Sequence, residues 1–146
     1  MPDISEPEAR ILLSQPLRCE DAPDWKNAGV QVGTSVLRSG LVDPMGVATG
    51  LYLELLYIPR PRALLVSYRF SVFRRNRCDV ERVYQLTVNQ SASPIKDKHR
   101  QSHEHLGASR HTRKASWQNW SYDEVFAYFC ARTNITFNPV PAHPER

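Results

Sequence analysis

The sequence contains few cysteines and no apolar run long enough to mark a membrane protein. Its three cysteines, Cys19, Cys78 and Cys130, have no C-x-x-C spacing, so they indicate free thiols rather than a disulfide framework or a zinc site. The longest apolar runs, Val47–Ile58 and Ala63–Phe73, are shorter than the roughly 20 residues that cross a bilayer. The acidic N-terminus also lacks the features of a secretory signal. We therefore expect a cytoplasmic protein that does not enter a membrane.

Glycine-rich loops and the common enzyme signatures are absent as well. The chain has only six glycines, and none of them belongs to a phosphate-binding loop motif. Neither G-x-S-x-G nor H-E-x-x-H occurs, and no cysteine stands at a useful spacing from a histidine. The length of 146 residues and the 41% of hydrophobic residues fit one domain with its own core, which we expect to span residues 1–146.

Basic residues are concentrated in the middle of the chain. Residues 1–59 carry four basic and eight acidic side chains, whereas residues 60–114 carry thirteen basic and four acidic ones, a net charge of +9. Residues 115–146 have a net charge of −1. A local excess of this size attracts polyanions, and nucleic acid is the first candidate. The alternative is that these charges only keep an exposed surface soluble.

Hydrophobic periodicity predicts an N-terminal helix followed by strands. Ser5 and Glu8 have the capping-box spacing, which predicts a short helix that ends before Pro16. The next segment, Leu17–Asn27, has no periodicity and predicts a loop. Alternation with period two then predicts strands at 30–36, 51–57, 66–72 and 80–88, separated by turns at Ser39–Gly46, Ile58–Arg62 and Arg74–Arg77.

The C-terminal part combines a long polar loop with one helix. The segment Asn89–Ser116 is nearly devoid of apolar residues, so we expect a basic loop with one short strand at His103–Leu106. Ser121 begins a second capping-box sequence, which predicts a helix over 122–133 that Asn134 ends. An edge strand at 135–137 and a loose tail at 138–146 follow.

Together these elements predict an α+β fold. An antiparallel meander of four or five strands packs one face against the 122–133 helix, and the N-terminal helix lies at an edge. No connection is long enough for a crossover helix, which favours antiparallel pairing throughout. The other face of the sheet and the 89–116 loop are then available for function.

Four of the five histidines gather in this basic loop, and they are the most unusual feature of the chain: His99, His103, His105 and His111. His103 and His105 are two residues apart, so on an extended strand both imidazoles project from one face and Glu104 projects from the other.

Three interpretations of the histidine cluster are open. The H-x-H spacing suits a transition metal, completed by His99, His111 or Asp97, but a cationic neighbourhood disfavours a dication and we expect no metal and no other cofactor. The second is phosphodiester cleavage, with His103 and His105 as acid and base, His99 or His111 assisting, and Arg100 or Arg110 on the phosphate. In the third, the histidines are solvated and contact a phosphate backbone or nothing.

Further basic and aromatic residues are candidates for contacts with nucleic acid. Arg69 lies opposite the apolar stripe of its strand, and Trp117 and Trp120 either stack on unpaired bases or pack the following helix onto the sheet. The candidate nucleic-acid-binding residues are Arg69, Arg74, Arg75, Arg77, Lys96, Lys98, Arg100, Arg113, Lys114, Trp117 and Trp120.

The strands that end in YRFSVF and VYQLTV, followed by KDKH, HEH and a tryptophan-led helix, resemble small proteins of bacterial toxin–antitoxin and phage-defence loci. This resemblance implies an RNA-directed or defence-related role. The leading hypothesis is a nucleic-acid-binding protein that prefers RNA to DNA, because no DNA-recognition helix is visible, with metal-independent ribonuclease activity as its catalytic form. The alternative is a non-catalytic module that docks an acidic protein partner.

Overall fold

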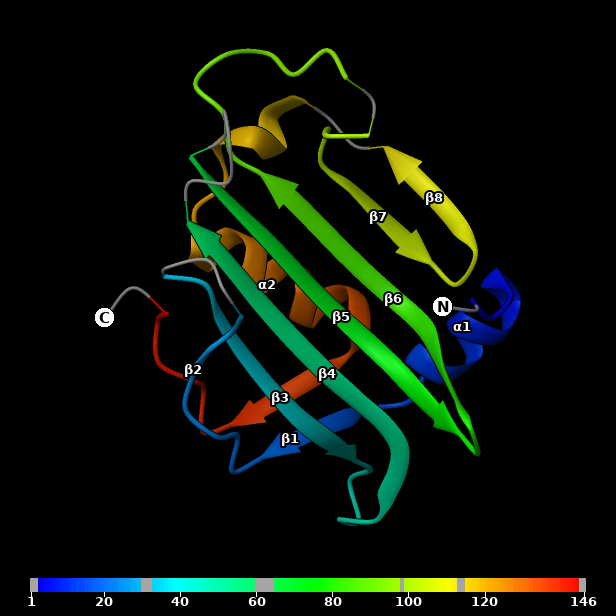
Figure 1. Cartoon of the computed structure of the whole chain (residues 1–146). Helices are drawn as coiled ribbons and strands as arrows, with labels where there is room; N and C mark the ends of the chain where they lie inside the picture. Colours follow the sequence, from blue (N-terminus) through cyan, green and yellow to red (C-terminus); the bar gives the residue numbers. More distant parts are fainter. Residues whose placement is uncertain (1–2, 30–32, 60–64, 98, 113–114, 145–146) are drawn as a thin grey trace.

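The structure, a computed structural model, describes residues 3–29, 33–59, 65–97, 99–112 and 115–144 (Figure 1). The helices and strands in these ranges are α1 (Glu6–Leu13), β1 (Leu17–Glu20), β2 (Lys26–Asn27), β3 (Ser35–Val42), β4 (Ala48–Pro59), β5 (Val66–Asn76), β6 (Asp79–Asn89), β7 (His103–Leu106), β8 (Ser109–Thr112), the 3-10 helix η1 (Ala115–Asn119), α2 (Tyr122–Thr133) and β9 (Ile135–Asn138). The predicted α+β class is confirmed, with a larger sheet than expected. None of the helices in these ranges is long and apolar enough to span a membrane.

The described strands form one sheet whose central part is a meander. Strands β3 to β8 pair with their sequence neighbours in antiparallel fashion. Beyond β3 the sheet continues with β1 and then β9, which is parallel to β1, while β2 pairs with β3. The segment Leu17–Asn27, predicted to be a loop, therefore contains two strands. The prediction was wrong because these short strands depend on distant partners rather than on a local pattern.

One face of the sheet is covered by α2, which carries the chain from β8 to β9 at the opposite edge (Figure 1). This crossing makes β9 parallel to β1, which the sequence reading did not anticipate. Leu53, Leu55 and Phe70 are fully buried on this face, and the ring of Phe129 on α2 lies 5.6 Å from that of Phe70. Burial of each such side chain contributes about 1.5–3 kcal/mol to the free energy of folding. We call this the helix face and the opposite one the open face.

Both α-helices begin at the serines that the capping spacing indicates. The Ser5 hydroxyl accepts a hydrogen bond from the backbone N–H of Glu8, and Ser121 and Glu124 form a complete capping box. Asn134 ends α2 in a left-handed conformation with φ of 60°. These caps satisfy backbone groups that the helix ends would otherwise leave unpaired, and they confirm the predicted helices.

The strands are longer than the periodicity indicated. The turn predicted at Ser39–Gly46 shrinks because β3 continues to Val42, with Leu41 buried. The hairpin tip predicted at Arg74–Arg77 is likewise only a turn at Arg77 and Cys78. Residues 30–32 of the first predicted strand and 60–62 of the proline turn lie outside the described residues.

An irregularity interrupts the pairing of β5 with β6 between Val72 and Phe73. Val83 and Tyr84 are both fully buried as a result, so the alternation of β6 changes phase at this point. Arg82 therefore turns to the open face beside Gln85, whose side-chain oxygen accepts a hydrogen bond from it at 3.1 Å. Glu81 pairs with Arg74 on the helix face.

The predicted 89–116 loop is partly ordered into a hairpin. Its predicted strand is β7, and a second strand, β8, returns beside it at the edge of the sheet. The turn between them contains Gly107, with φ of +56°, and a Cβ atom there would lie 2.5 Å from the carbonyl oxygen of Ile4. Only glycine fits at this position, where the hairpin packs closely against the N-terminal segment.

Candidate functional site

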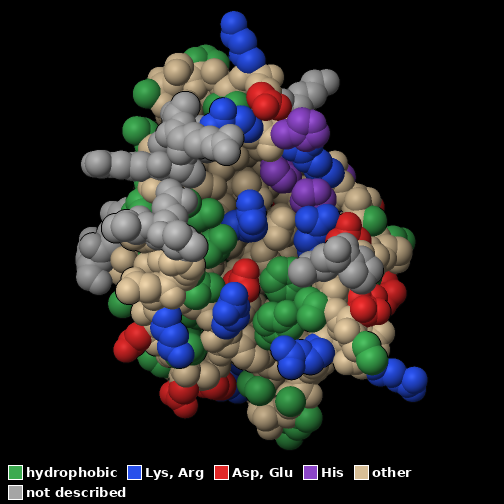
Figure 2. Space-filling view, in the orientation of Figure 1, with side chains coloured by type: hydrophobic (Ala, Val, Ile, Leu, Met, Phe, Trp, Pro, Cys, Tyr) green, Lys and Arg blue, Asp and Glu red, His purple; other side chains and the backbone are tan. Residues whose placement is uncertain are grey.

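The open face carries the two central histidines and several arginines. Figure 2 views this face and shows histidines gathered at its upper right, with Lys and Arg side chains around them and hydrophobic side chains below. The register explains the grouping, because Arg69, Thr87 and His103 are cross-strand partners on β5, β6 and β7. Ser71, Gln85 and His105 form the adjacent row. Side chains on adjacent rows of one face are within contact distance.

His103 and His105 lie side by side on β7, as their spacing predicted. Their ring centroids are 5.1 Å apart, and the rings are nearly perpendicular, at 84°. His103 is buried and His105 is half-buried. Nδ1 of His103 lies 2.8 Å from the carbonyl oxygen of Gln101. Since a carbonyl oxygen only accepts hydrogen bonds, we assign the proton of His103 to Nδ1, which leaves the Nε2 lone pair available.

Both imidazoles are held neutral near pH 7. Burial lowers the pKa of His103, the Gln101 carbonyl opposes this shift, and Arg110, Arg82 and Arg69 add to it. Burial, Arg82 and His103 lower the pKa of His105 to about 4. The buried Nδ1 of His105 has no hydrogen-bond partner among the described residues. A proton on this atom would therefore have no acceptor there to stabilise the charged ring. His103 is therefore the easier of the two to protonate.

Three arginines from three strands surround this pair. Arg69 on β5 is exposed and has no ion pair with any residue that the structure describes. Nη2 of Arg110 on β8 lies 3.4 Å from Nδ1 of His103. Arg82 on β6 pairs with Asp3 at 2.8 Å and also raises the local positive potential at His105. Fixed positive charges beside neutral imidazoles suit a phosphodiester better than a metal ion.

Arg82 was not among the residues that the sequence predicted for this site. Strict alternation from Tyr84 places Arg82 on the helix face, and only the irregularity opposite Val72 and Phe73 reverses this placement. A hydrogen-bond chain then links Arg82 through Gln85 to the hydroxyl of Ser71. No sequence signal marks the irregularity, whereas Gln85 could have been found from its alternation with Tyr84 and Leu86.

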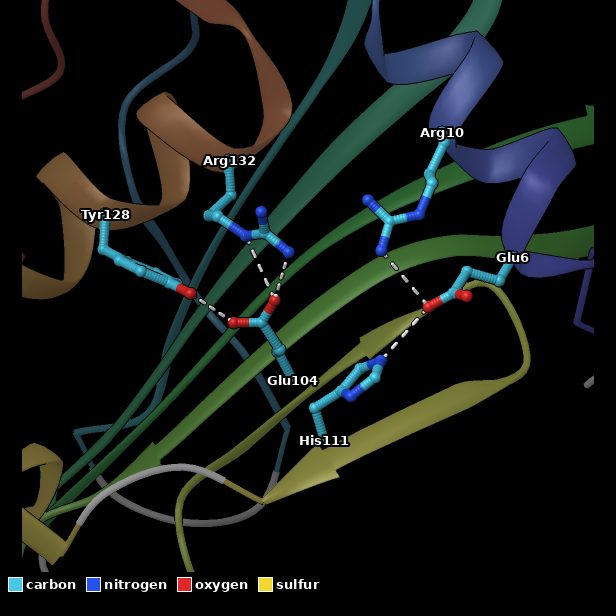
Figure 3. Close-up of polar contacts among 6 residues, drawn as sticks. All are labelled: Glu6, Arg10, Glu104, His111, Tyr128 and Arg132. Carbon is cyan, nitrogen blue, oxygen red and sulfur yellow. Dashed lines mark hydrogen bonds and ion pairs between the residues drawn. The ribbon is translucent and has the colours of Figure 1, made fainter.

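Between the two histidines, Glu104 projects to the helix face and is completely buried. One of its carboxylate oxygens accepts hydrogen bonds from Nε and Nη2 of Arg132, at 3.1 and 2.7 Å, and the other accepts one from the hydroxyl of Tyr128 (Figure 3). Burial and the Glu104 carboxylate raise the pKa of Tyr84 nearby. This cluster ties β7 to α2 and fixes which face the histidines occupy.

His111 and His99 do not join the pair. His111 pairs with Glu104 across β7 and β8, so it faces the helix side, where its Nε2 lies 3.1 Å from Oε1 of Glu6 (Figure 3). The expectation that His111 assists the pair is wrong, because β8 is a strand with alternating faces rather than a loop. His99 lies exposed in the 90–102 connection, and no contact of the described residues joins its ring to the pair.

The other predicted basic contacts divide between the two faces. Arg74 lies on the helix face in ion pairs with Glu8 and Glu81, so its predicted contact with nucleic acid is not supported. Arg75 is exposed on the open face, above the ring of Tyr52, and Arg77 is exposed in the turn beyond. The remaining described residues of this group, Lys96 and Arg100, line a loop pocket of about 300 Å³. Lys98, Arg113 and Lys114 lie outside the described residues.

The two tryptophans pack against α2, which agrees with the alternative interpretation given for them. Trp117 is buried, its ring is stacked on Trp120 with centroids 4.4 Å apart, and Tyr128 contacts both. The Trp120 carbonyl also accepts a hydrogen bond from the side chain of Gln90. Both rings thus have neighbours that a stacking base would need to displace.

Within the described ranges, no group of three or more His, Cys, Asp or Glu side chains could hold a metal ion. No family model, curated protein or solved structure matches the chain.

Proposed function

We propose that the open face binds RNA and that His103 and His105 cleave it without a metal ion. The observation that carries the proposal is the pair of imidazoles, 5.1 Å apart, amid the charges of Arg69, Arg82 and Arg110. A phosphate held by these arginines would lie within reach of both rings. RNA is favoured over DNA because this chemistry uses the ribose 2′-hydroxyl.

The different environments of the two histidines assign their roles. His105, with a pKa of about 4, is the general base that removes the 2′-hydroxyl proton. His103, whose proton on Nδ1 is held by Gln101, carries a second proton on Nε2 in its charged form and donates it to the leaving 5′ oxygen. The 2′ oxygen forms a bond to phosphorus as the bond to the 5′ oxygen breaks, so the products are a 2′,3′-cyclic phosphate and a 5′-hydroxyl. The arginines stabilise the charge of the pentacoordinate phosphorus.

Incubation of purified protein with total RNA in EDTA tests this proposal. We expect cleavage by the wild type and a loss of at least about 100-fold in rate for His103→Ala/His105→Ala, since each acid–base group contributes about 10²–10⁴-fold. His111→Ala is the matched control, because its ring faces α1 instead. Equal cleavage by the double variant would disprove the catalytic role, and RNA that is neither cleaved nor retarded on a gel would disprove RNA binding as well.

A further inference from the structure

Beyond the histidine pair, the open face carries an aromatic cluster on β4 and β5. Tyr52 and Phe73 are cross-strand partners, with ring centroids 5.4 Å apart. Phe73 is buried beneath this surface, whereas Tyr52 is partly exposed. The exposed guanidinium of Arg75 lies 5.7 Å from the centroid of the Tyr52 ring. We call Tyr52, Phe73 and Arg75 the aromatic platform.

The platform is next to the histidine site rather than elsewhere on the molecule. Phe73 pairs with Arg82 across β5 and β6, and Arg82 is the arginine that acts most strongly on His105. His105 is in register with Ser71 on β5, so Phe73 lies two strand spacings, roughly 10 Å, across the sheet from His105 and about 7 Å further along the strand. A short stretch of RNA can therefore place a phosphate at Arg82 and a base at Tyr52.

Glu54 is an acidic residue on the open face beside the platform. Glu54 is on the open face two residues after Tyr52, and its carboxylate accepts a hydrogen bond of 2.6 Å from Nε of Arg38. Because Arg38 offsets this negative charge, Glu54 adds no net positive charge beside the platform, and the phosphates have their cationic partners on the side of Arg69 and Arg82. The bases are then directed toward the platform, where a base stacks on the exposed guanidinium of Arg75 or takes its place over the Tyr52 ring.

From this arrangement we infer that the aromatic platform is a nucleobase-binding subsite and that the substrate is single-stranded RNA. Stacking on Tyr52 requires a base whose flat face is free, which a duplex does not offer. Stacking accepts any base, so this subsite selects unpaired RNA rather than a particular sequence. The inference rests on the proposed function, because it takes the adjacent arginines and histidines as the phosphate site.

Binding of an uncleavable oligonucleotide tests the subsite separately from catalysis. The probe is a labelled single-stranded 2′-O-methyl RNA of about eight nucleotides, a typical length for one small binding fold. We expect Tyr52→Ala to weaken its binding about 10-fold and Tyr52→Phe, which keeps the ring, to change it less than about 2-fold. A fully paired duplex of the same length should bind more weakly to the wild type and be insensitive to Tyr52→Ala.

A second measurement uses the wild-type protein and does not depend on the folding of the variant. The same oligonucleotide with abasic sites keeps its phosphates but has no rings to stack, and we expect it to bind about 10-fold more weakly than the intact probe. Equal binding of the abasic and intact probes would overturn the subsite, even if RNA is cleaved. Absence of binding by every probe, together with intact total RNA, would overturn both the subsite and the proposed function.

Discussion

At the scale of single residues, the histidine pair shows how two identical side chains on one strand acquire different acidities. His103 has the carbonyl of Gln101 to stabilise its charged form, whereas the buried nitrogen of His105 has no partner among the described residues. Both rings also experience the positive charge of Arg82 and Arg110. Burial is the largest cause of both pKa shifts, and the neighbouring groups make the two values differ.

These pKa values predict that cleavage is fastest in mildly acidic solution. The base His105 must be deprotonated, which occurs above about pH 4, and the acid His103 must be protonated, which occurs below its own pKa, which burial lowers from the ordinary value of about 6.5. A plot of kcat/KM against pH should therefore be bell-shaped, with its maximum between about pH 4 and pH 6.5. The His105→Asn variant should lose the acidic limb of this profile, and a wild-type profile that rises continuously to pH 8 would contradict the assignment.

Glu104 is a second residue whose environment predicts a measurable effect. Its carboxylate is fully buried and satisfied by Arg132 and Tyr128, so Glu104→Ala leaves a guanidinium without its partner. We expect a loss of about 3 kcal/mol in the free energy of unfolding, measured with urea. Glu54→Ala removes a carboxylate that pairs with the largely exposed Arg38 and should cost less than about 1 kcal/mol. Equal losses would show that the buried pair is not structural.

At the scale of secondary structure elements, the hairpin of β7 and β8 depends on its contact with the N-terminal segment. A side chain at Gly107 meets the carbonyl oxygens of Ile4 and Ser5, at 2.5 and 2.6 Å from its Cβ atom. We expect Gly107→Ala to lower the free energy of unfolding by about 2 kcal/mol or more and to weaken RNA binding, because the hairpin carries the histidines.

The control for this change is Gly46→Ala, which also has a positive φ, of +83°, but no atom within 4 Å of the added Cβ. It measures the cost of the backbone conformation alone, about 1 kcal/mol. Thermal or urea unfolding of the two variants gives the comparison. A loss no greater for Gly107→Ala than for Gly46→Ala would mean that the hairpin does not rely on this contact.

The same elements show what the sequence could predict. Local signals found α1, α2, the buried stripe Leu51–Tyr57 and the strand of His103 and His105, because capping and alternation are properties of neighbouring residues. Strand β1 and the crossing of α2 over the sheet were not predicted, since both depend on a partner far along the chain. The faces of Arg82 and His111 were not predicted for the same reason. The face of Arg82 depends on the irregular register between β5 and β6, and that of His111 depends on β8, which was not predicted.

At the scale of the whole molecule, the two faces divide the charge that the sequence concentrates in residues 60–114. Acidic residues of the N-terminal segment neutralise part of it, through Glu8 on Arg74 and Asp3 on Arg82. Arg69 and Arg110 lie on the open face, where their charges act on His103. Among the described residues, Arg69, Arg82 and Arg110 therefore give the open face positive charge beside the histidine pair, and this is the charge on which the proposed RNA binding depends.

This division predicts a modest salt dependence of binding. If Arg69, Arg82 and Arg110 contact phosphates, log K for single-stranded RNA should fall with log salt at a slope of about −2, and Arg69→Ala should reduce the steepness by about 0.7. Fluorescence titration at several salt concentrations measures both slopes. Arg10→Ala, on α1, should leave the slope unchanged. A slope near zero would instead indicate an apolar interface of the kind that docks a protein partner.

The most direct test of the central claim is a two-dimensional NMR titration of the histidine imidazoles with an uncleavable 2′-O-methyl RNA. We expect the signals of His103 and His105 to shift on binding and both pKa values to rise, because a bound phosphate stabilises the imidazolium. The signals of His111, which faces Glu6 on the opposite side of the sheet, should stay in place. Shifts confined to His111, or no shift of any histidine at saturating RNA, would contradict the account.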